Sequence, residues 1–338
     1  MRLLSSVMCL LGCAAAAFAR GLRSVCPVLN TSATGVCDWV MPQNEVLAHL
    51  GFTGDDPAQT LYLLGDSVSR FLASRIACVY SGAEVGSHAE VKEQCSVDNP
   101  KNLLNRVQLC SFEGPRFRTV FAWFQWLLHP PPIGPKDMPA KDQMTDSCTA
   151  LRFRHTNGLR ECFSELFAQA KPSDVLIVRS GLQYLLYSKI FVGTVCKGMA
   201  GCHAIPWEFE LQRGLEHALP LLKSMFPGTL VWWLLTPFND WNHANCMPPL
   251  QSVGLNISAA NNILRVALRK HSVPYVEPIS TWNSPCSQQV QSSFVDCIHF
   301  FEPAQSLATA SLMLAVSEAR ATRESPHSLL SQIIKGRL

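Results

Sequence analysis

The chain has 338 residues, of which 48% are hydrophobic and 16% are charged, and its formal net charge is +3. Such a high apolar content with so few charges excludes an extensively disordered protein and supplies a sizeable core for one large domain or two ordinary ones. The small net charge and the lack of a lysine and arginine run give no indication of a nucleic-acid-binding protein.

The N-terminus is typical of a secretory signal peptide. Arg2 precedes an apolar stretch that ends near Phe18, and the Ala-Phe-Ala sequence there fits cleavage after Ala19. An uncleaved signal anchor is the alternative, although the apolar stretch is short for a membrane span. We therefore expect a signal peptide or anchor at 1–19 and a single domain at 20–338, with no membrane span in the mature chain.

The cysteines and two sequons also indicate a secretory route. Two of the 14 cysteines lie in the leader, so an even number remains, as disulfide pairing favours. Asn30 and Asn256 begin N-glycosylation sequons. Cys196, Cys202 and His203 lack the paired short spacing of zinc sites, so we expect no metal centre there. The expected location is the secretory pathway, either the Golgi lumen or outside the cell.

Short apolar segments alternate with longer helical patterns along the chain. The short segments are rich in Val, Ile, Leu, Tyr or Trp, which is typical of buried strands. The expected strands are 61–64, 119–124, 175–178, 229–235 and 274–276. The expected helices are 68–79, 159–170, 208–225, 257–270 and 304–319. This alternation predicts an α/β fold, in which helices cover both faces of a central parallel sheet.

The first motif of chemical interest is GDSVSR, directly after the first expected strand. Gly65 allows a tight turn at the carboxyl end of the strand, where ligands of open α/β sheets bind. Ser67 falls in the first turn of the next helix, whose N-terminal amides can hold a developing oxyanion. Ser67 is therefore a candidate nucleophile. Taken alone, the motif is more typical of a helix cap formed by Asp66 or Ser67.

The second motif lies near the C-terminus, where Asp296 precedes His299 by three residues. One turn of chain can bring these side chains together, so that the carboxylate accepts from one ring nitrogen while the other faces Ser67. Serine, aspartate and histidine in this order supply the parts of a nucleophilic acyl-transfer site. Taken alone, an Asp-x-x-His sequence is also compatible with a surface turn and a core histidine.

Together the motifs resemble the PC-esterase branch of the GDSL/SGNH acyl-esterase superfamily. That branch includes the plant trichome-birefringence-like polysaccharide O-acetyltransferases and relatives of the sialic-acid O-acetyltransferase. The residues that match its GDSxxR and DCxH motifs are Gly65, Asp66, Ser67, Arg70, Asp296, Cys297, His299 and Pro303. Segments that begin at Arg118, Asp174 and Leu234 are also similar, so that the resemblance covers about residues 60 to 310.

The resemblance implies a three-layer α/β/α SGNH-hydrolase-like fold, with Ser67 as nucleophile, His299 as base and Asp296 as the group that orients the base. Arg179 stands where the family usually has an asparagine, whose equivalent in the superfamily donates to the oxyanion. The Ser67 amide, Gly181 and Arg179 are the candidate oxyanion donors, and Arg179 could instead contact an acidic glycan. The further candidates for oxyanion or substrate binding are Gly65, Asp66, Arg70 and Trp241.

The tryptophans are candidates for stacking on sugar rings. Trp241 lies in the polar sequence NDWNH and is the better glycan candidate, whereas Trp232 and Trp233 lie in an apolar run and are expected in the core.

We expect a serine acyl-transfer enzyme that requires no metal or cofactor. Its expected reaction carries an acetyl group from an acyl donor, through acetyl-Ser67, to a hydroxyl of a glycan or polysaccharide. One alternative is a carbohydrate O-acetyl esterase that uses the same intermediate. A second is a non-catalytic glycan-binding protein of the same fold, which the arginine at position 179 suggests.

Overall fold

The computed structural model describes the chain in several stretches. The described residues are 59–86, 88–95, 103–104, 107–124, 127, 158–186, 206–235, 245–246, 255–276, 299, 305, 308–309, 312–313 and 316. Outside them lie the predicted leader at 1–19, the Asn30 sequon, Cys196, Cys202, His203, Trp241, Asp296, Cys297 and Pro303. What the sequence indicates for those residues stays a prediction.

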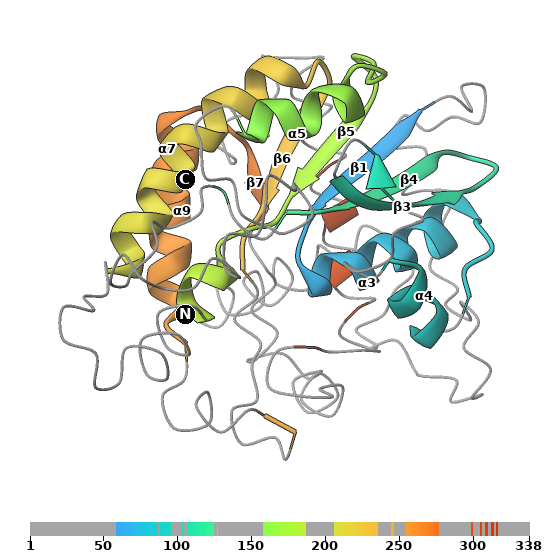
Figure 1. The fold of residues 1–338 in the computed structure, drawn as a ribbon, viewed down its shortest axis with the longest axis horizontal. Coiled ribbons are helices and arrows are strands. Elements are labelled where there is room, and N and C mark those ends of the chain that lie inside the picture. Colours follow the sequence, from blue (N-terminus) through green and yellow to red (C-terminus); the bar gives the residue numbers. More distant parts are fainter. Residues whose placement is uncertain are drawn as a thin grey trace, which may run out of the picture.

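Seven strands of the described chain pair into one sheet, which lies between layers of helices (Figure 1). They are β1 (Thr60–Gly65), β2 (Leu103–Leu104), β3 (Val107–Glu113), β4 (Arg118–Trp123), β5 (Val175–Val178), β6 (Thr229–Trp233) and β7 (Tyr275–Val276). Their order across the sheet is β2-β3-β4-β1-β5-β6-β7. The last five in this order run parallel, whereas β3 is antiparallel to β4 and β2 is antiparallel to β3.

The antiparallel edge departs from the predicted parallel sheet. The connection between β3 and β4 consists only of residues 114–117. A parallel pair needs a crossover of about a dozen residues or more, so this short connection permits only antiparallel pairing. β3 is not among the predicted strands, because VQLCSFE interleaves polar and apolar residues and contains no continuous apolar run.

Helices cover both faces of the sheet, which confirms the predicted α/β fold in three layers. They are α3 (Ser67–Ile76), the π-helix η1 (Ala77–Ser81), α4 (His88–Gln94), α5 (Gly158–Phe167), α7 (Trp207–Met225) and α9 (Ile257–Lys270). One side of the sheet carries α5, α7 and α9, and the other carries α3 and α4 (Figure 1). Four predicted helices thus correspond to α3 with η1, α5, α7 and α9, whereas the short, polar α4 was not predicted.

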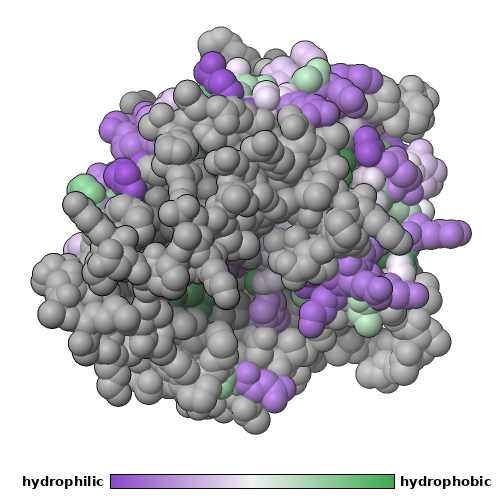
Figure 2. Space-filling view, viewed as in Figure 1, coloured by the Kyte–Doolittle hydropathy of each residue, from purple (hydrophilic) through white to green (hydrophobic). Residues whose placement is uncertain are grey.

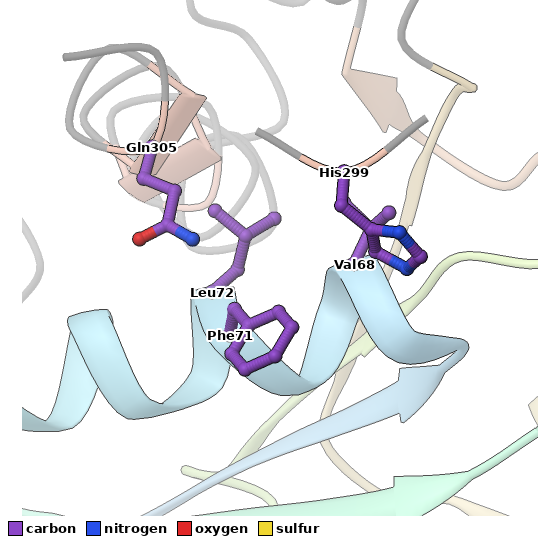
Figure 3. A pocket seen from close by; sticks show the side chains of 5 residues that line it. All are labelled: Val68, Phe71, Leu72, His299 and Gln305. Atoms are coloured by element: carbon purple, nitrogen blue, oxygen red, sulfur yellow. The ribbon is translucent and has the colours of Figure 1, made fainter. Parts of the chain in front are cut away.

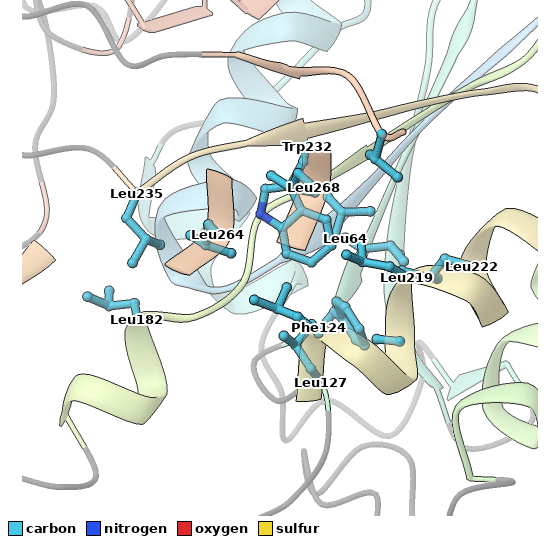
Figure 4. Close-up of a cluster of buried hydrophobic side chains, with 14 of the residues drawn as sticks. Leu64, Phe124, Leu127, Leu182, Leu219, Leu222, Trp232, Leu235, Leu264 and Leu268 are labelled. Atoms are coloured by element: carbon cyan, nitrogen blue, oxygen red, sulfur yellow. The ribbon is translucent and has the colours of Figure 1, made fainter. Parts of the chain in front are cut away.

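Each face of the sheet has its own apolar core. Along β1, Tyr62 and Leu64 belong to the core beneath α5, α7 and α9, and Leu61 and Leu63 to the core beneath α3. This alternation follows from the two-residue period of a strand. Figure 4 shows the first core around the buried Trp232. In the helix predicted at 304–319, the described residues are helical and buried, and most belong to the core beneath α3.

The described surface is largely hydrophilic in the view of Figure 2, and its exposed large apolar side chains are Phe209 and Val266. Among the described helices, none combines the length and the apolar character that a membrane span requires.

A disulfide joins Cys95, after α4, to Cys110 of β3, and Cys78 and Cys246 are disulfide-bonded as well.

Candidate active site

The turn between β1 and α3 places Ser67 at the carboxyl edge of the sheet. β1 ends at Gly65 and α3 begins at Ser67, so a single residue separates strand from helix. A Cβ atom on Gly65 would lie 2.1 Å from Oγ of Ser69 and 3.0 Å from the carbonyl oxygen of Arg179. Only glycine fits this close approach, which accounts for the Gly-Asp-Ser sequence at the turn.

Asp66 fixes the start of α3. Its Oδ1 accepts hydrogen bonds from the backbone amides of Val68 (3.1 Å) and Ser69 (3.3 Å), so Asp66 is the N-cap residue. The helix cap suggested by the sequence is therefore confirmed for Asp66. The side chain of Ser67 does not form this cap and is available for another partner.

Arg179 pairs with the other oxygen of the same carboxylate. Its Nη1 lies 2.5 Å from Oδ2 of Asp66, and the side chains of Arg179 and Asp66 are 2% and 3% exposed. The backbone amide of Arg179 donates to the carbonyl of Leu64, and its guanidinium lies 5.0 Å from the ring centre of Trp233. The guanidinium is thus engaged with the residue that precedes Ser67 and has almost no access to solvent.

The structure brings Ser67 and His299 together from positions 232 residues apart. Oγ of Ser67 lies 2.6 Å from Nε2 of His299. This distance is within the range of a hydrogen bond between a hydroxyl and a ring nitrogen, and it leaves Nδ1 of the ring for an orienting acid. Asp296, the predicted acid, lies outside the described residues.

The Ser67 amide is a donor at the open end of α3. The Asp66 carboxylate accepts from the amides of Val68 and Ser69, and within the described chain the Ser67 amide donates no hydrogen bond. A helix N-terminus carries such unsatisfied N–H groups and a partial positive charge. This amide can therefore donate to an anion that forms on a group bonded to Ser67 Oγ.

Gly181 adopts a conformation that favours glycine, with φ of 125°. A Cβ atom there would face the side chains of Leu211, Leu235 and Leu264, which belong to the core beneath α7 and α9. No contact among the described residues joins Gly181 to Ser67 or His299, and its carbonyl accepts from the Tyr184 amide. Its role as an oxyanion donor stays a prediction.

A small pocket lies against His299. It is lined by Val68, Phe71, Leu72, His299 and Gln305 (Figure 3). Val68, Phe71 and Leu72 stand at positions i, i+3 and i+4 of α3, so this spacing could have identified them as one face of the helix that begins at Ser67. Gln305 had no such signal, because its place depends on how the C-terminal segment packs against α3.

Arg70 is the fourth residue of α3 and is buried, with 6% of its surface exposed. Its guanidinium lies over the rings of Phe71 and Trp123, at 4.5 Å and 5.4 Å from their centres. Burial lowers the pKa of Arg70 to about 10.

Among the described residues, no group of three or more His, Cys, Asp or Glu side chains could hold a metal ion.

No protein-family model matches the chain, and no curated protein matches it. Three solved structures show distant similarity. A putative GDSL-like lipase from Parabacteroides merdae is 10% identical, with a TM-score of 0.38, and the match covers 77% of this chain and 96% of that one. The native aryl esterase of M. smegmatis is 13% identical, with a TM-score of 0.36 and coverage of 79% and 99%.

The third structure, a peptidoglycan O-acetylesterase, is 10% identical, with a TM-score of 0.40 and coverage of 84% of this chain and 96% of that one.

Proposed function

We propose that the protein is a serine-dependent enzyme of acyl transfer on carbohydrate, which acts through an acyl-Ser67 intermediate. The observation that carries this proposal is the 2.6 Å contact between Ser67 Oγ and His299 Nε2 at the carboxyl edge of the sheet. A serine with only a structural role at a helix start would bond to the backbone of its own helix. Here Asp66 performs that task, and Ser67 instead meets a base.

In the first half of the reaction, Ser67 Oγ attacks the carbonyl carbon of an acyl ester while His299 Nε2 takes the hydroxyl proton. The resulting oxyanion accepts a hydrogen bond from the Ser67 amide at the N-terminus of α3. The bond from the acyl carbon to the leaving oxygen then breaks, and His299 gives its proton to that oxygen. Asp296 is the proposed partner of Nδ1 and stabilises the imidazolium.

In the second half, a hydroxyl group attacks the acyl carbon of acyl-Ser67. His299 takes the proton of this acceptor, the bond to Ser67 Oγ breaks, and the proton returns to Oγ. A sugar hydroxyl as acceptor gives an O-acyltransferase, and water gives an esterase. We propose transfer to a glycan or polysaccharide, as the sequence resemblance implies, with Trp241 as a stacking platform for the sugar.

We propose an acetyl group as the acyl group. The sequence resemblance supports this choice. The side chains of Val68, Phe71 and Leu72 beside His299 are apolar, and Gln305 adds a polar group there. We also propose a secretory location. The disulfide-bonded state of Cys78, Cys95, Cys110 and Cys246 supports this, because disulfides persist in oxidising compartments.

Turnover of an acetyl ester, with and without a sugar acceptor, tests the proposal. The donor would be 4-nitrophenyl acetate, and the products would be separated by mass spectrometry. Ser67→Ala should lower kcat by about 10³-fold or more. Ser74→Ala is the matched control, because it removes a hydroxyl from the same helix that donates only to the carbonyl of Phe71.

The products separate the two reaction types. Acetylated sugar in preference to acetate is the result expected of a transferase. Acetate alone, at every concentration of oligosaccharide acceptor, would instead identify an esterase. No turnover by folded wild-type protein would contradict both and favour the glycan-binding alternative.

A further inference from the structure

Arg70 is a buried cation without an acidic partner among the described residues. No ion pair or side-chain hydrogen bond joins its guanidinium to a described residue, and its Nε is enclosed without an acceptor. Burying an ion costs several kcal/mol unless an opposite charge or hydrogen bonds compensate. Cation–π contacts to Phe71 and Trp123 compensate in part, since each is worth about 0.5–2 kcal/mol.

Arg179 differs from Arg70 in having an acidic partner among the described residues. Both arginines are almost fully buried, and both lie over aromatic rings. Arg179 is neutralised by Asp66, whereas Arg70 has no such carboxylate among the described residues. Of the two guanidinium groups near the turn at Ser67, one is therefore neutralised by a carboxylate of the described residues and the other is not.

The position of Arg70 connects it to the candidate nucleophile. Arg70 follows Ser67 by three positions on α3, and residues so spaced are neighbours on a helix surface, about 5–6 Å apart at Cβ. Long helical side chains lean toward the helix N-terminus, which is the end of α3 where Ser67 lies. The ring of Trp123, beneath the guanidinium, belongs to the residue that pairs with Gly65 across β1 and β4.

Phe71 joins Arg70 to the pocket of the site. Its ring contacts the guanidinium of Arg70 and also lines the pocket that contains His299 (Figure 3). Arg70 and His299 therefore lie around the same aromatic side chain.

The ring of Trp123, which lies under the guanidinium of Arg70, is held in place by several contacts. Nε1 of Trp123 donates to the carbonyl of Cys95 at 2.9 Å, and Cys95 is fixed to Cys110 by the disulfide. The ring of Phe121 also packs edge-on against Trp123. A guanidinium held on a fixed platform loses little freedom when it binds an anion, which favours affinity.

We infer that Arg70 binds a carboxylate of the sugar that exchanges its acyl group with Ser67, both when this sugar is the acceptor in transfer and when its ester is attacked in the deacylating direction. A planar guanidinium matches a carboxylate and can donate two parallel hydrogen bonds to it. The inferred substrate class is the O-acylated acidic sugar, in which a uronate-type carboxylate lies near the ester. This inference rests on the proposed function for the ester and adds the charge of the substrate.

Equilibrium binding tests the subsite without requiring turnover. Glucuronate and glucose form a matched pair that differs in a carboxylate, and each would be titrated by NMR into the Ser67→Ala protein. We expect glucuronate to bind more tightly, and the addition of Arg70→Gln to weaken its binding by about 10- to 100-fold. Arg75→Gln, the same change farther along α3, is the control and should leave binding unchanged.

Kinetics with acetylated methyl glucuronide and acetylated methyl glucoside give the second readout. In wild-type protein the ratio of the two kcat/KM values should favour the uronide, and Arg70→Gln should lower this ratio mainly through KM. Arg70→Lys, which keeps the charge but loses the planar fork, should restore only part of it.

Stability separates a binding role from a structural one. Arg70→Met should leave the urea midpoint unchanged or raise it, because it removes a buried charge that has no acidic partner among the described residues. A large loss of stability would overturn the inference, as would equal binding of glucuronate and glucose or glucuronate binding that does not respond to Arg70→Gln. If no ester is turned over but glucuronate binding still depends on Arg70, the proposed function fails and the subsite stands.

Discussion

Asp66 and Arg179 form a buried ion pair directly before Ser67, with 2.5 Å between Oδ2 and Nη1. The other carboxylate oxygen of Asp66 caps α3. One carboxylate therefore connects the end of β5 to the start of the helix that presents Ser67. Arg179 therefore has a structural partner, which accounts for a buried positive charge at this position.

Arg179→Met should lower the free energy of unfolding by about 3–5 kcal/mol, because it leaves the Asp66 carboxylate buried without its partner. Urea denaturation measures this change. Arg269→Met is a suitable control, since Arg269 is exposed and lies over Tyr275 at the surface. A change for Arg179→Met no larger than that of the control would show that the pair contributes little.

Gly65→Ala should disturb the turn that carries Ser67. The added methyl group would collide with Ser69 and approach the backbone of Arg179. We expect a loss of about 1–3 kcal/mol in stability, which is typical of overpacking, and a larger relative loss of acylation rate. Thermal unfolding and a stopped-flow acylation assay measure the two effects.

Gly86→Ala serves as the control for this turn, because the nearest atom to its added Cβ is the flexible carboxylate end of Glu90. Wild-type acylation by Gly65→Ala would show that the turn tolerates a side chain, in conflict with the geometry described above.

The disulfide between Cys95 and Cys110 should stabilise the part of the sheet formed by β3 and β4, where Trp123 lies. It closes a loop of 15 residues, for which chain entropy predicts about 3 kcal/mol. The double variant Cys95→Ser/Cys110→Ser avoids a free thiol and should lose about this amount in urea unfolding. An unchanged unfolding midpoint would mean that the disulfide adds no stability beyond that of the other contacts of β3 and β4.

Asn256 combines a helix cap with a glycosylation sequon. Its Oδ1 accepts from the amide of Ala259 at 3.0 Å, and its exposed amide nitrogen is free for a glycan. In protein without glycans, Asn256→Ala should cost about 1 kcal/mol, whereas Asn256→Asp keeps the cap and should cost less. Expressed in a secretory host, both variants should lose the mass of one glycan, and an unaltered glycan mass would show that the sequon is not used.

Local patterns predicted the elements that carry long apolar runs. The strand at 175–178 and the helix at 257–270 have the predicted bounds, because β5 is buried throughout and α9 begins at the Asn256 cap. The edge strand β3 and the short α4 lack such signals. Their placement depends on the hairpin to β4 and on the disulfide between Cys95 and Cys110.

In the site, too, local motifs predicted some features, whereas others depend on how distant segments pack together. The two end motifs predicted that Ser67 and His299 meet, and the structure places them in contact. The partner of Arg179 could not be predicted, because its ion pair with Asp66 depends on β5 lying next to β1 in the sheet. Among the described residues Arg70 has no acidic partner, which likewise depends on packing and has no counterpart in the local sequence. Catalytic roles for Ser67, His299 and Asp296 stay predictions.

The most direct test of the central claim is the intact mass of the mature protein after mixing with 4-nitrophenyl acetate. We predict that the wild-type protein and Ser74→Ala gain one acetyl group, that peptide mapping places it on Ser67, and that Ser67→Ala gains none. A folded wild-type protein without an adduct, or an adduct that persists in Ser67→Ala, would contradict the assignment of Ser67 as the nucleophile.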